Sequence, residues 1–185
     1  MRLLVAAVSV LVIAVGSVAW SRAITGGNDV DALLDEPGSY ILPNLVTNPP
    51  LQHDVLPAVD LLDAAGQDVQ LVPDGRPMVV NLWYSQCPPC ARELADFAVV
   101  HEELGQQVRF VGVNPQDTAT TMTSFAADRG VTYELLRDRE GAFGEALDVV
   151  SYPVTLFVGP DGAIVDSTGT IDDDELRARI TELWP

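Results

Sequence analysis

The feature that most constrains this chain is an apolar segment that leads into a Cys-Pro-Pro-Cys motif. Residues 78–83, Met-Val-Val-Asn-Leu-Trp, are almost entirely apolar, and the motif Cys87 to Cys90 follows three residues later. A short, continuous apolar segment of this kind is typical of a strand buried on both faces of a parallel sheet. Proline is tolerated in the first turn of a helix because the N–H that it lacks has no partner there. We therefore predict a buried strand, a short loop and a helix that begins at the motif.

The segment after the motif has the spacing of a helix with one buried face. Its inward positions recur three and four residues apart, up to a predicted end near Gly105, and are Leu94, Phe97, Ala98, His101 and Leu104. Cys87 would lie at the helix N-terminus, where unpaired N–H groups and the helix dipole favour an anion. The anion of a cysteine is the thiolate, which is the nucleophile of disulfide exchange. Cys90, one turn later, is placed to attack a mixed disulfide on Cys87 and release the partner.

The cysteine pair also has two other interpretations. A structural zinc site needs four ligands, and the chain has no second cysteine pair, with only His53 and His101 besides. An inert disulfide across two intervening residues closes a loop too small to restrict the unfolded chain by much. The spacing favours a redox-active dithiol that needs no metal and no cofactor, and it leaves both alternatives open.

The N-terminus contains a long uncharged segment. Residues 3–20 carry no charge and end in Trp20, a residue enriched at membrane interfaces. As a helix they would span about 27 Å, close to the thickness of a bilayer's hydrocarbon core. We predict that residues 1–23 form a membrane anchor, with a cleaved signal peptide as the alternative. Residues 24–55, which are interrupted by prolines and glycines, are predicted to be a linker to a domain at 56–185.

Composition excludes some partners. The 185 residues carry a formal net charge of −17. Nucleic acid and anionic lipid surfaces are therefore unfavourable partners. A domain of this length has room for one core of ordinary size, and we expect a monomer.

The remainder of the domain alternates predicted strands and helices. In chain order we predict a hairpin at 59–71, a strand at 108–113, a helix capped by Asp117 and closed by Gly130, a short helical piece around Phe143, a strand at 151–158, a strand at 163–165, and a helix that begins at Asp172. Strands that alternate with helices indicate an α/β fold with a central sheet.

Three stretches together resemble a known family. They are Asn81-Leu82-Trp83 before the motif, Gly112-Val113-Asn114, and the Pro-initiated strand at 152–158. They are similar to thioredoxin-fold proteins, above all to the membrane-anchored TlpA/ResA/CcmG type of thiol-disulfide oxidoreductase. The resemblance covers roughly residues 56–183, and it implies a central mixed sheet flanked by helices.

The resemblance also implies roles for single residues. Cys87 is then the nucleophile and Cys90 the resolving thiol. Pro153 corresponds to the family's cis-proline, which lies across from the dithiol and exposes a backbone edge to the partner chain. The residues implied to contact the client protein are Tyr152, Pro153, Trp83 and Pro88.

Two positions depart from the wider family. Gln86 precedes the first cysteine where the family usually has Trp. Cytosolic thioredoxins carry a buried Asp, which accepts the proton of the resolving thiol, at the position of Asn81, and an amide cannot do this. The membrane-anchored type commonly has Asn there together with a Glu three residues after the second cysteine, which is Glu93 here. The resemblance therefore implies that Glu93 handles the proton, whereas spacing alone fits a solvated helix acid equally well.

The predicted function follows from this chemistry and from the predicted location. We expect an extracytoplasmic reductase of disulfides in exported proteins, for example apocytochrome c. No nucleotide or flavin fingerprint is present, so we expect a CcdA/DsbD-like transmembrane protein to supply the electrons. The alternatives are a disulfide-forming oxidase, a thiol peroxidase, and an assembly factor that uses the groove for binding without catalysis. A peroxidase would need a threonine-rich site that is absent before Cys87.

Overall fold

The computed structural model describes residues 48–51 and 54–185. Its helices and strands, in chain order, are β1 (Asp60–Leu62), β2 (Asp68–Gln70), β3 (Met78–Leu82), α2 (Pro88–Leu104), β4 (Arg109–Asn114), α3 (Ala119–Ala127), β5 (Glu134–Arg137), α4 (Ala142–Ala146), β6 (Val154–Val158), β7 (Ile164–Thr168) and α5 (Asp173–Leu183).

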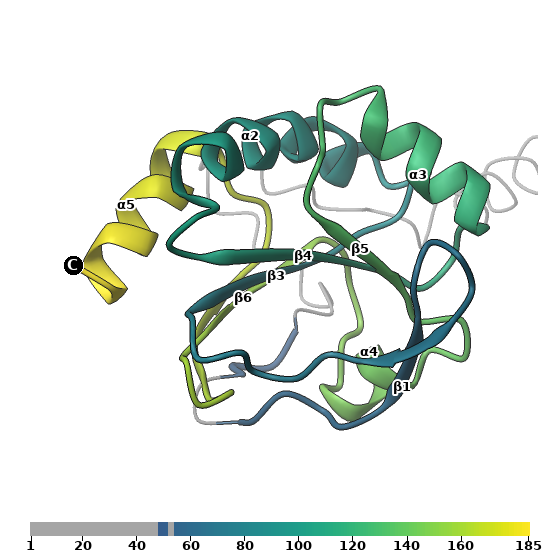
Figure 1. Cartoon of the computed structure of the whole chain (residues 1–185), viewed down its shortest axis with the longest axis horizontal. Coiled ribbons are helices and arrows are strands. Elements are labelled where there is room, and N and C mark those ends of the chain that lie inside the picture. The colour runs from purple at the N-terminus through teal and green to yellow at the C-terminus, as the bar shows by residue number, and fades with distance from the viewer. Residues whose placement is uncertain (1–47, 52–53) are drawn as a thin grey trace, which may run out of the picture. The chain divides into compact units, whose positions relative to one another are not determined.

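The strands form one mixed sheet in the order β2-β1-β5-β4-β3-β6-β7. Strands β3, β4 and β5 are parallel to one another, whereas β6 is antiparallel to β3 and β7 is antiparallel to β6. Helices α2, α3 and α5 lie on one face of this sheet and α4 lies on the other (Figure 1). The described residues thus form three layers, with the sheet in the middle, as expected for an α/β fold.

Strand β3 is buried on both faces, which explains its continuous apolar sequence. Val79 and Trp83 belong to the core beneath α2, α3 and α5, whereas Val80 and Leu82 belong to the core on the α4 side. Side chains alternate between the two faces of a strand, so burial of both faces requires every position to be compatible with a core. The sequence-based prediction of a buried parallel strand is confirmed.

Most predicted elements are found, and three details differ. Residues of β5 (Glu134–Arg137), for which we predicted no strand, pair with β4. Thr118, not Asp117, caps α3, because the Thr118 side chain accepts the backbone N–H of Thr121 at 3.1 Å. The Asp117 side chain is engaged elsewhere, as described below. On α2 the fully buried side chains include Val100 instead of His101, which is only half-buried.

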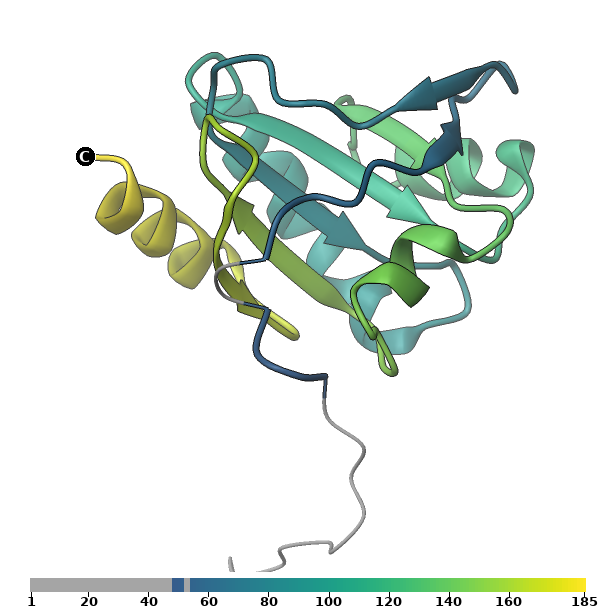
Figure 2. The same ribbon diagram turned by 90° about the horizontal axis from the view of Figure 1, so that it is seen from below.

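The end of the predicted linker contacts the domain. The Asp54 carbonyl accepts the N–H of Ile164 at 2.7 Å, and the Leu51 side chain is buried in the core on the α4 side. Seen from below, the chain between residue 54 and β1 runs across the face that carries α4 (Figure 2). The predicted anchor at 1–23, and the linker before residue 48, lie outside the described residues. Within 48–51 and 54–185, no helix is both long and apolar enough to cross a membrane.

Candidate active site

The Cys-Pro-Pro-Cys motif begins helix α2 as predicted. Cys87 is the N-cap residue, and its Sγ accepts the backbone N–H of Cys90 at 3.3 Å. Pro88 occupies the first helical position and is exposed. The two cysteines form a disulfide, in which Cys87 is 3% exposed and Cys90 is 0% exposed. Both sulfur-bearing residues are thus buried in the disulfide form, and the roles of Cys87 as nucleophile and Cys90 as resolving thiol stay a prediction.

An aspartate on another loop holds the segment before Cys87. The Asp117 carboxylate accepts the Ser85 N–H at 2.7 Å and the Ser85 hydroxyl at 2.6 Å. It also accepts the side-chain amide of Asn114 at 2.7 Å. Three charge-assisted hydrogen bonds to one carboxylate fix the loop that leads to the nucleophile. The sequence does not predict this role, because Ser85 lies 32 residues from Asp117 and leaves no local signal.

The register of β3 and β6 brings the cis-proline to the motif. Leu82, the last residue of β3, pairs with Val154, the first residue of β6. The loop after β3 and the loop before β6 therefore lie at the same end of the strands. The Tyr152–Pro153 peptide bond is cis, as the resemblance implies. The ring of Tyr152 meets the edge of Tyr84, with 5.5 Å between the ring centroids. This contact joins the cis-proline loop to the loop before Cys87.

Glu93 lies inside the molecule. It is 1% exposed, and its two carboxylate oxygens accept the Asn81 side-chain amide at 2.8 Å and the Ile171 backbone N–H at 3.3 Å. Burial raises the pKa of Glu93 to about 7, even though these two hydrogen bonds favour the charged form. A carboxyl group with this pKa exchanges protons readily near neutral pH. The alternative of a solvated helix acid is wrong.

The surroundings of Glu93 are buried and polar. Asn81 also donates to the Thr155 hydroxyl at 3.3 Å, whereas its carbonyl oxygen has no partner among the described residues. The Tyr133 hydroxyl is likewise buried without a described partner. Burial, and secondarily the charge of Glu93, raises the pKa of Tyr133. Glu93 is therefore the acid in this region that changes its protonation near neutral pH.

The predicted client contacts are not all accessible. Tyr152 is half-buried and Pro153 is buried, although both line a pocket, whereas Pro88 is exposed beside Cys87. Trp83, in contrast, is 0% exposed and stacks on Phe125 with 5.9 Å between the ring centroids. Trp83 is thus a core residue, and its prediction as a client contact is wrong. The position of Trp83, directly after β3, faces the α2 layer, so the indole lies in the core.

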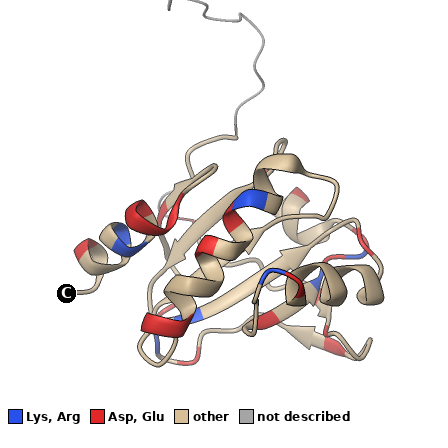
Figure 3. Ribbon diagram, turned by 90° about the horizontal axis from the view of Figure 1, so that it is seen from above, with Lys and Arg blue, Asp and Glu red and all other residues tan. Residues whose placement is uncertain are grey.

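Within the described part of the chain, no group of three or more His, Cys, Asp or Glu side chains has a geometry that could hold a metal ion. The acidic residues are distributed over separate helices and loops (Figure 3).

Comparison with known proteins decides the family. The AhpC/TSA family model matches residues 53–167, which is more than half of the chain. The chain belongs to the AhpC/TSA family.

Two relatives found by sequence comparison are named as disulfide-exchange proteins. The thiol-disulfide oxidoreductase ResA of Bacillus subtilis (strain 168) is 28% identical over 128 residues, which are 68% of this chain and 72% of ResA. The thiol:disulfide interchange protein DsbE of Escherichia coli (strain K12) is 28% identical over 130 residues, which are 68% of this chain and 69% of DsbE.

A solved structure supports the fold. The thioredoxin domain of a thiol-disulfide oxidoreductase from Bacteroides vulgatus superimposes with a TM-score of 0.65 at 19% identity, over 72% of this chain and 98% of that one. The predicted thioredoxin-like α/β fold is confirmed. With the Cys87–Cys90 disulfide at the helix start, the relatives identify this AhpC/TSA-family member as a thiol-disulfide oxidoreductase of the ResA/DsbE type.

Proposed function

We propose that the protein is an extracytoplasmic reductase, held at the membrane by residues 1–23, that reduces disulfides in exported proteins. The observation that carries the direction of electron flow is the buried Glu93, one helical turn after Cys90. Residues three apart on a helix have Cβ atoms about 5–6 Å from each other. A carboxylate at that distance inside the protein disfavours ionisation of the cysteine pair. A dithiol whose thiolates are poorly stabilised is a better reductant, because the reduced form of an oxidant is the stabilised one.

The reaction uses both cysteines in turn. The Cys87 thiolate attacks one sulfur of a client disulfide, forms a mixed disulfide and expels the other client sulfur as a thiolate. Cys90 then loses its proton and attacks the Cys87 sulfur, which forms the Cys87–Cys90 disulfide and releases the client's second thiol. The client gains two electrons, and the cysteine pair loses them.

Glu93 is the proposed acceptor of the Cys90 proton. A free thiol titrates near 8.5, so deprotonation of Cys90 near neutral pH needs a base. Asn81 cannot accept a proton, and its amide instead donates to Glu93. With a pKa of about 7, Glu93 can take the proton and return it to solvent.

The membrane location and the electron donor rest on the sequence. The uncharged segment 3–20 supports attachment to the membrane, and a cleaved signal would place the domain in the same compartment. A CcdA/DsbD-like transmembrane carrier is the proposed donor that reduces the Cys87–Cys90 disulfide again. Apocytochrome c is the proposed client, in line with the TlpA/ResA/CcmG resemblance.

An oxidase is the second candidate function, and one contact favours it. The N-terminus of α2 and the N–H of Cys90, which donates to the Cys87 sulfur, stabilise a thiolate on Cys87. A stabilised thiolate raises the reduction potential. The helix start and Glu93 therefore act in opposite directions.

The reduction potential of the cysteine pair decides between the two functions. It is measured by equilibrating the protein with defined ratios of reduced and oxidised dithiothreitol or glutathione. A reductase predicts a value of about −270 mV or lower, whereas a value of about −120 mV would assign the protein as an oxidase. Glu93→Gln serves as the internal comparison, because removal of the buried carboxylate should raise the potential if Glu93 destabilises the thiolates.

A further inference from the structure

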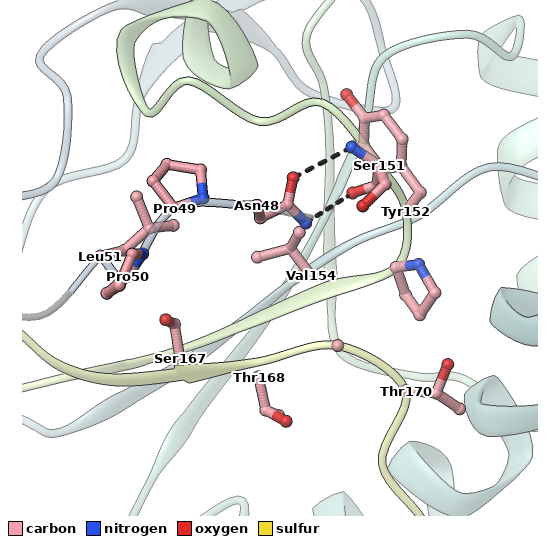
Figure 4. Close-up of a pocket in the computed structure, with 12 residues that line it drawn as sticks. Asn48, Pro49, Pro50, Leu51, Ser151, Tyr152, Val154, Ser167, Thr168 and Thr170 are labelled. Carbon is pink, nitrogen blue, oxygen red and sulfur yellow. Dashed lines mark hydrogen bonds between the residues drawn. The ribbon is translucent and has the colours of Figure 1, made fainter. Parts of the chain in front are cut away.

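A pocket opens beside the cis peptide bond (Figure 4). It has a volume of about 590 Å³, and three segments distant in sequence form its walls, namely residues 48–51, 151–154 and 167–170. Thr168 pairs with Thr155 across β6 and β7, so the end of β7 lies at the same sheet edge as the start of β6. The pocket therefore lies at the end of the sheet where β3 leads into the Cys87 loop, and the cis-proline Pro153 is one of its lining residues.

One wall is a strap formed by residues 48–51, which precede the domain as the sequence defines it. The side-chain oxygen of Asn48 accepts the backbone N–H groups of Val150 at 2.8 Å and Ser151 at 3.0 Å. Its side-chain nitrogen donates to the Ser151 carbonyl at 2.9 Å (Figure 4). Leu51, at the other end of the strap, is 3% exposed. One amide and one apolar side chain thus hold the strap against the segment that leads into Pro153.

The pocket is uncharged in a strongly acidic protein. None of the twelve residues that line it is charged, although the chain has a net charge of −17. Ser167 and Thr170 offer hydroxyl groups, whereas Pro49, Pro50 and Val154 offer apolar surface. A charged side chain that entered this pocket would lose water without gaining an ionic partner, which is unfavourable. A neutral side chain finds both apolar contacts and hydrogen-bonding groups.

We propose that this pocket is a client subsite, which receives an uncharged side chain next to the reactive cysteine of an extended client polypeptide, and that Asn48 maintains it by holding the strap. The proposal rests on the proposed function, since a protein client must reach Cys87 along this edge. We assign a client polypeptide as the occupant because the cis-proline, Pro153, is itself one of the residues that line the pocket. Its volume also falls within the range of about 300–1,000 Å³ that is usual for binding pockets.

The subsite has a consequence for the linker. The strap belongs to the predicted linker at 24–55, so the end of this linker forms part of the client-binding surface. Thr170, on the opposite wall, precedes Ile171, whose N–H donates to Glu93. A client side chain in the pocket would therefore lie between the end of the linker and the segment that precedes Ile171.

The test uses the reduced full-length protein in detergent micelles and three peptide disulfides. Each probe is a symmetric dimer of one short peptide, joined through a single cysteine that is flanked by Asn, by Asp or by Lys. Hydroxyethyl disulfide, which has no flanking residue, reports the chemistry alone. The rate of Cys87–Cys90 oxidation is followed by tryptophan fluorescence or by thiol trapping, in a single turnover at 0.5 M salt to screen long-range charge effects.

We expect the Asn peptide to react about tenfold faster than both the Asp and the Lys peptides, which corresponds to about 1.4 kcal/mol of discrimination. Asn48→Ala should reduce this preference to about twofold, and its rate with hydroxyethyl disulfide is measured alongside so that the preference is compared at equal cysteine reactivity. Gln70→Ala, on the distant hairpin, is the matched control and should behave as the wild type. Ser167→Asp, which adds a carboxylate to the pocket, should make the Lys peptide the preferred probe.

Three results would overturn the subsite. The first is that the Lys peptide reacts fastest and the Asp peptide slowest in every variant, because attraction to the protein's negative net charge alone predicts that order of rates. The second is an equal rate for all three peptides in the wild type. The third is a uniform acceleration on deletion of residues 24–44, because this would assign the pocket to the chain's own upstream segment. Failure to oxidise with any probe, hydroxyethyl disulfide included, would instead refute the proposed function.

Discussion

Replacement of Glu93 by Gln should change how the stability of the domain depends on pH. Burial raises the pKa of Glu93 in the folded protein to about 7, whereas an unfolded chain leaves it near the ordinary value of 4.5. Between these two values the folded state holds a proton that the unfolded state has released. The stabilisation from this proton is fully present below about pH 4.5 and is lost as the pH rises through 7.

The magnitude follows from the difference between the two pKa values. A difference of 7 minus 4.5, or about 2.5 units, corresponds to about 3 kcal/mol at 1.36 kcal/mol per unit. Little solvent screening applies, because the carboxyl group is 1% exposed. Glu93 alone should therefore lower the free energy of unfolding by about 3 kcal/mol between pH 4.5 and pH 8. For a protein of this size, that is a decrease in melting temperature of about 6–12 °C.

Gln removes the titration and keeps the shape of the side chain. Its amide oxygen can accept the N–H of Asn81, but its NH₂ group cannot accept the N–H of Ile171, and that loss costs about 1 kcal/mol. The variant should thus be about 1 kcal/mol less stable than the wild type at pH 4.5 and about 2 kcal/mol more stable at pH 8. The two stability curves should cross between about pH 5 and pH 6.

The assay is urea unfolding of residues 45–185 with the disulfide intact, at half-unit steps from pH 4.5 to pH 8. Linear extrapolation gives the free energy of unfolding of each protein, and the variant-minus-wild-type difference isolates Glu93 from the other titrating groups. Glu182→Gln, at an exposed position of α5, is the matched control and should show a flat difference. A change of less than about 1 kcal/mol in the Glu93→Gln difference over this range would refute the argument from burial.

Three further predictions concern the cysteines, the loop before them and the strap. Cys90→Ser should accumulate mixed disulfides with client proteins on non-reducing gels, whereas Cys87→Ser should not, and equal trapping by both would void the assigned roles. Asp117→Ala should lower the free energy of unfolding by about 2 kcal/mol in urea titrations, because it leaves the half-buried donors of Ser85 without an acceptor. Leu51→Ala should cost about 2 kcal/mol in the same titrations if the strap is part of the folded domain, and no change would contradict that.

The parts of the fold that could be predicted are those specified by local sequence. The continuous apolar pattern of β3 and the prolines after Cys87 each favour one local structure, and the structure contains both. Strand β5 was not predicted because its four residues, Glu-Leu-Leu-Arg, show no alternation of apolar and polar side chains. It forms a strand because β4 presents free backbone groups beside it.

The parts of the site that could not be predicted depend on distant residues. Ser85 and Asp117 are 32 residues apart, Glu93 and Ile171 are 78 apart, and Asn48 and Ser151 are 103 apart. Each of these polar side chains has an equally acceptable local role, such as a helix cap, a solvated acid or a turn residue. Only the fold determines which role is realised, since it decides which backbone groups come within hydrogen-bonding distance.

The contrast between Trp83 and Glu93 shows how burial changes a chemical role. An indole directly after a strand suggests a recognition surface, yet the side chain of Trp83 faces α2 and α3 and becomes part of the core. A glutamate in the middle of a helix suggests a solvated surface, yet on α2 its side faces Asn81 and the segment before α5. The same face of the sheet buries both side chains. For Glu93 this burial raises the pKa to about 7, which is close to neutral pH. The layer that removes Trp83 from the client surface is therefore the one that makes Glu93 suitable for proton transfer to and from the cysteine pair.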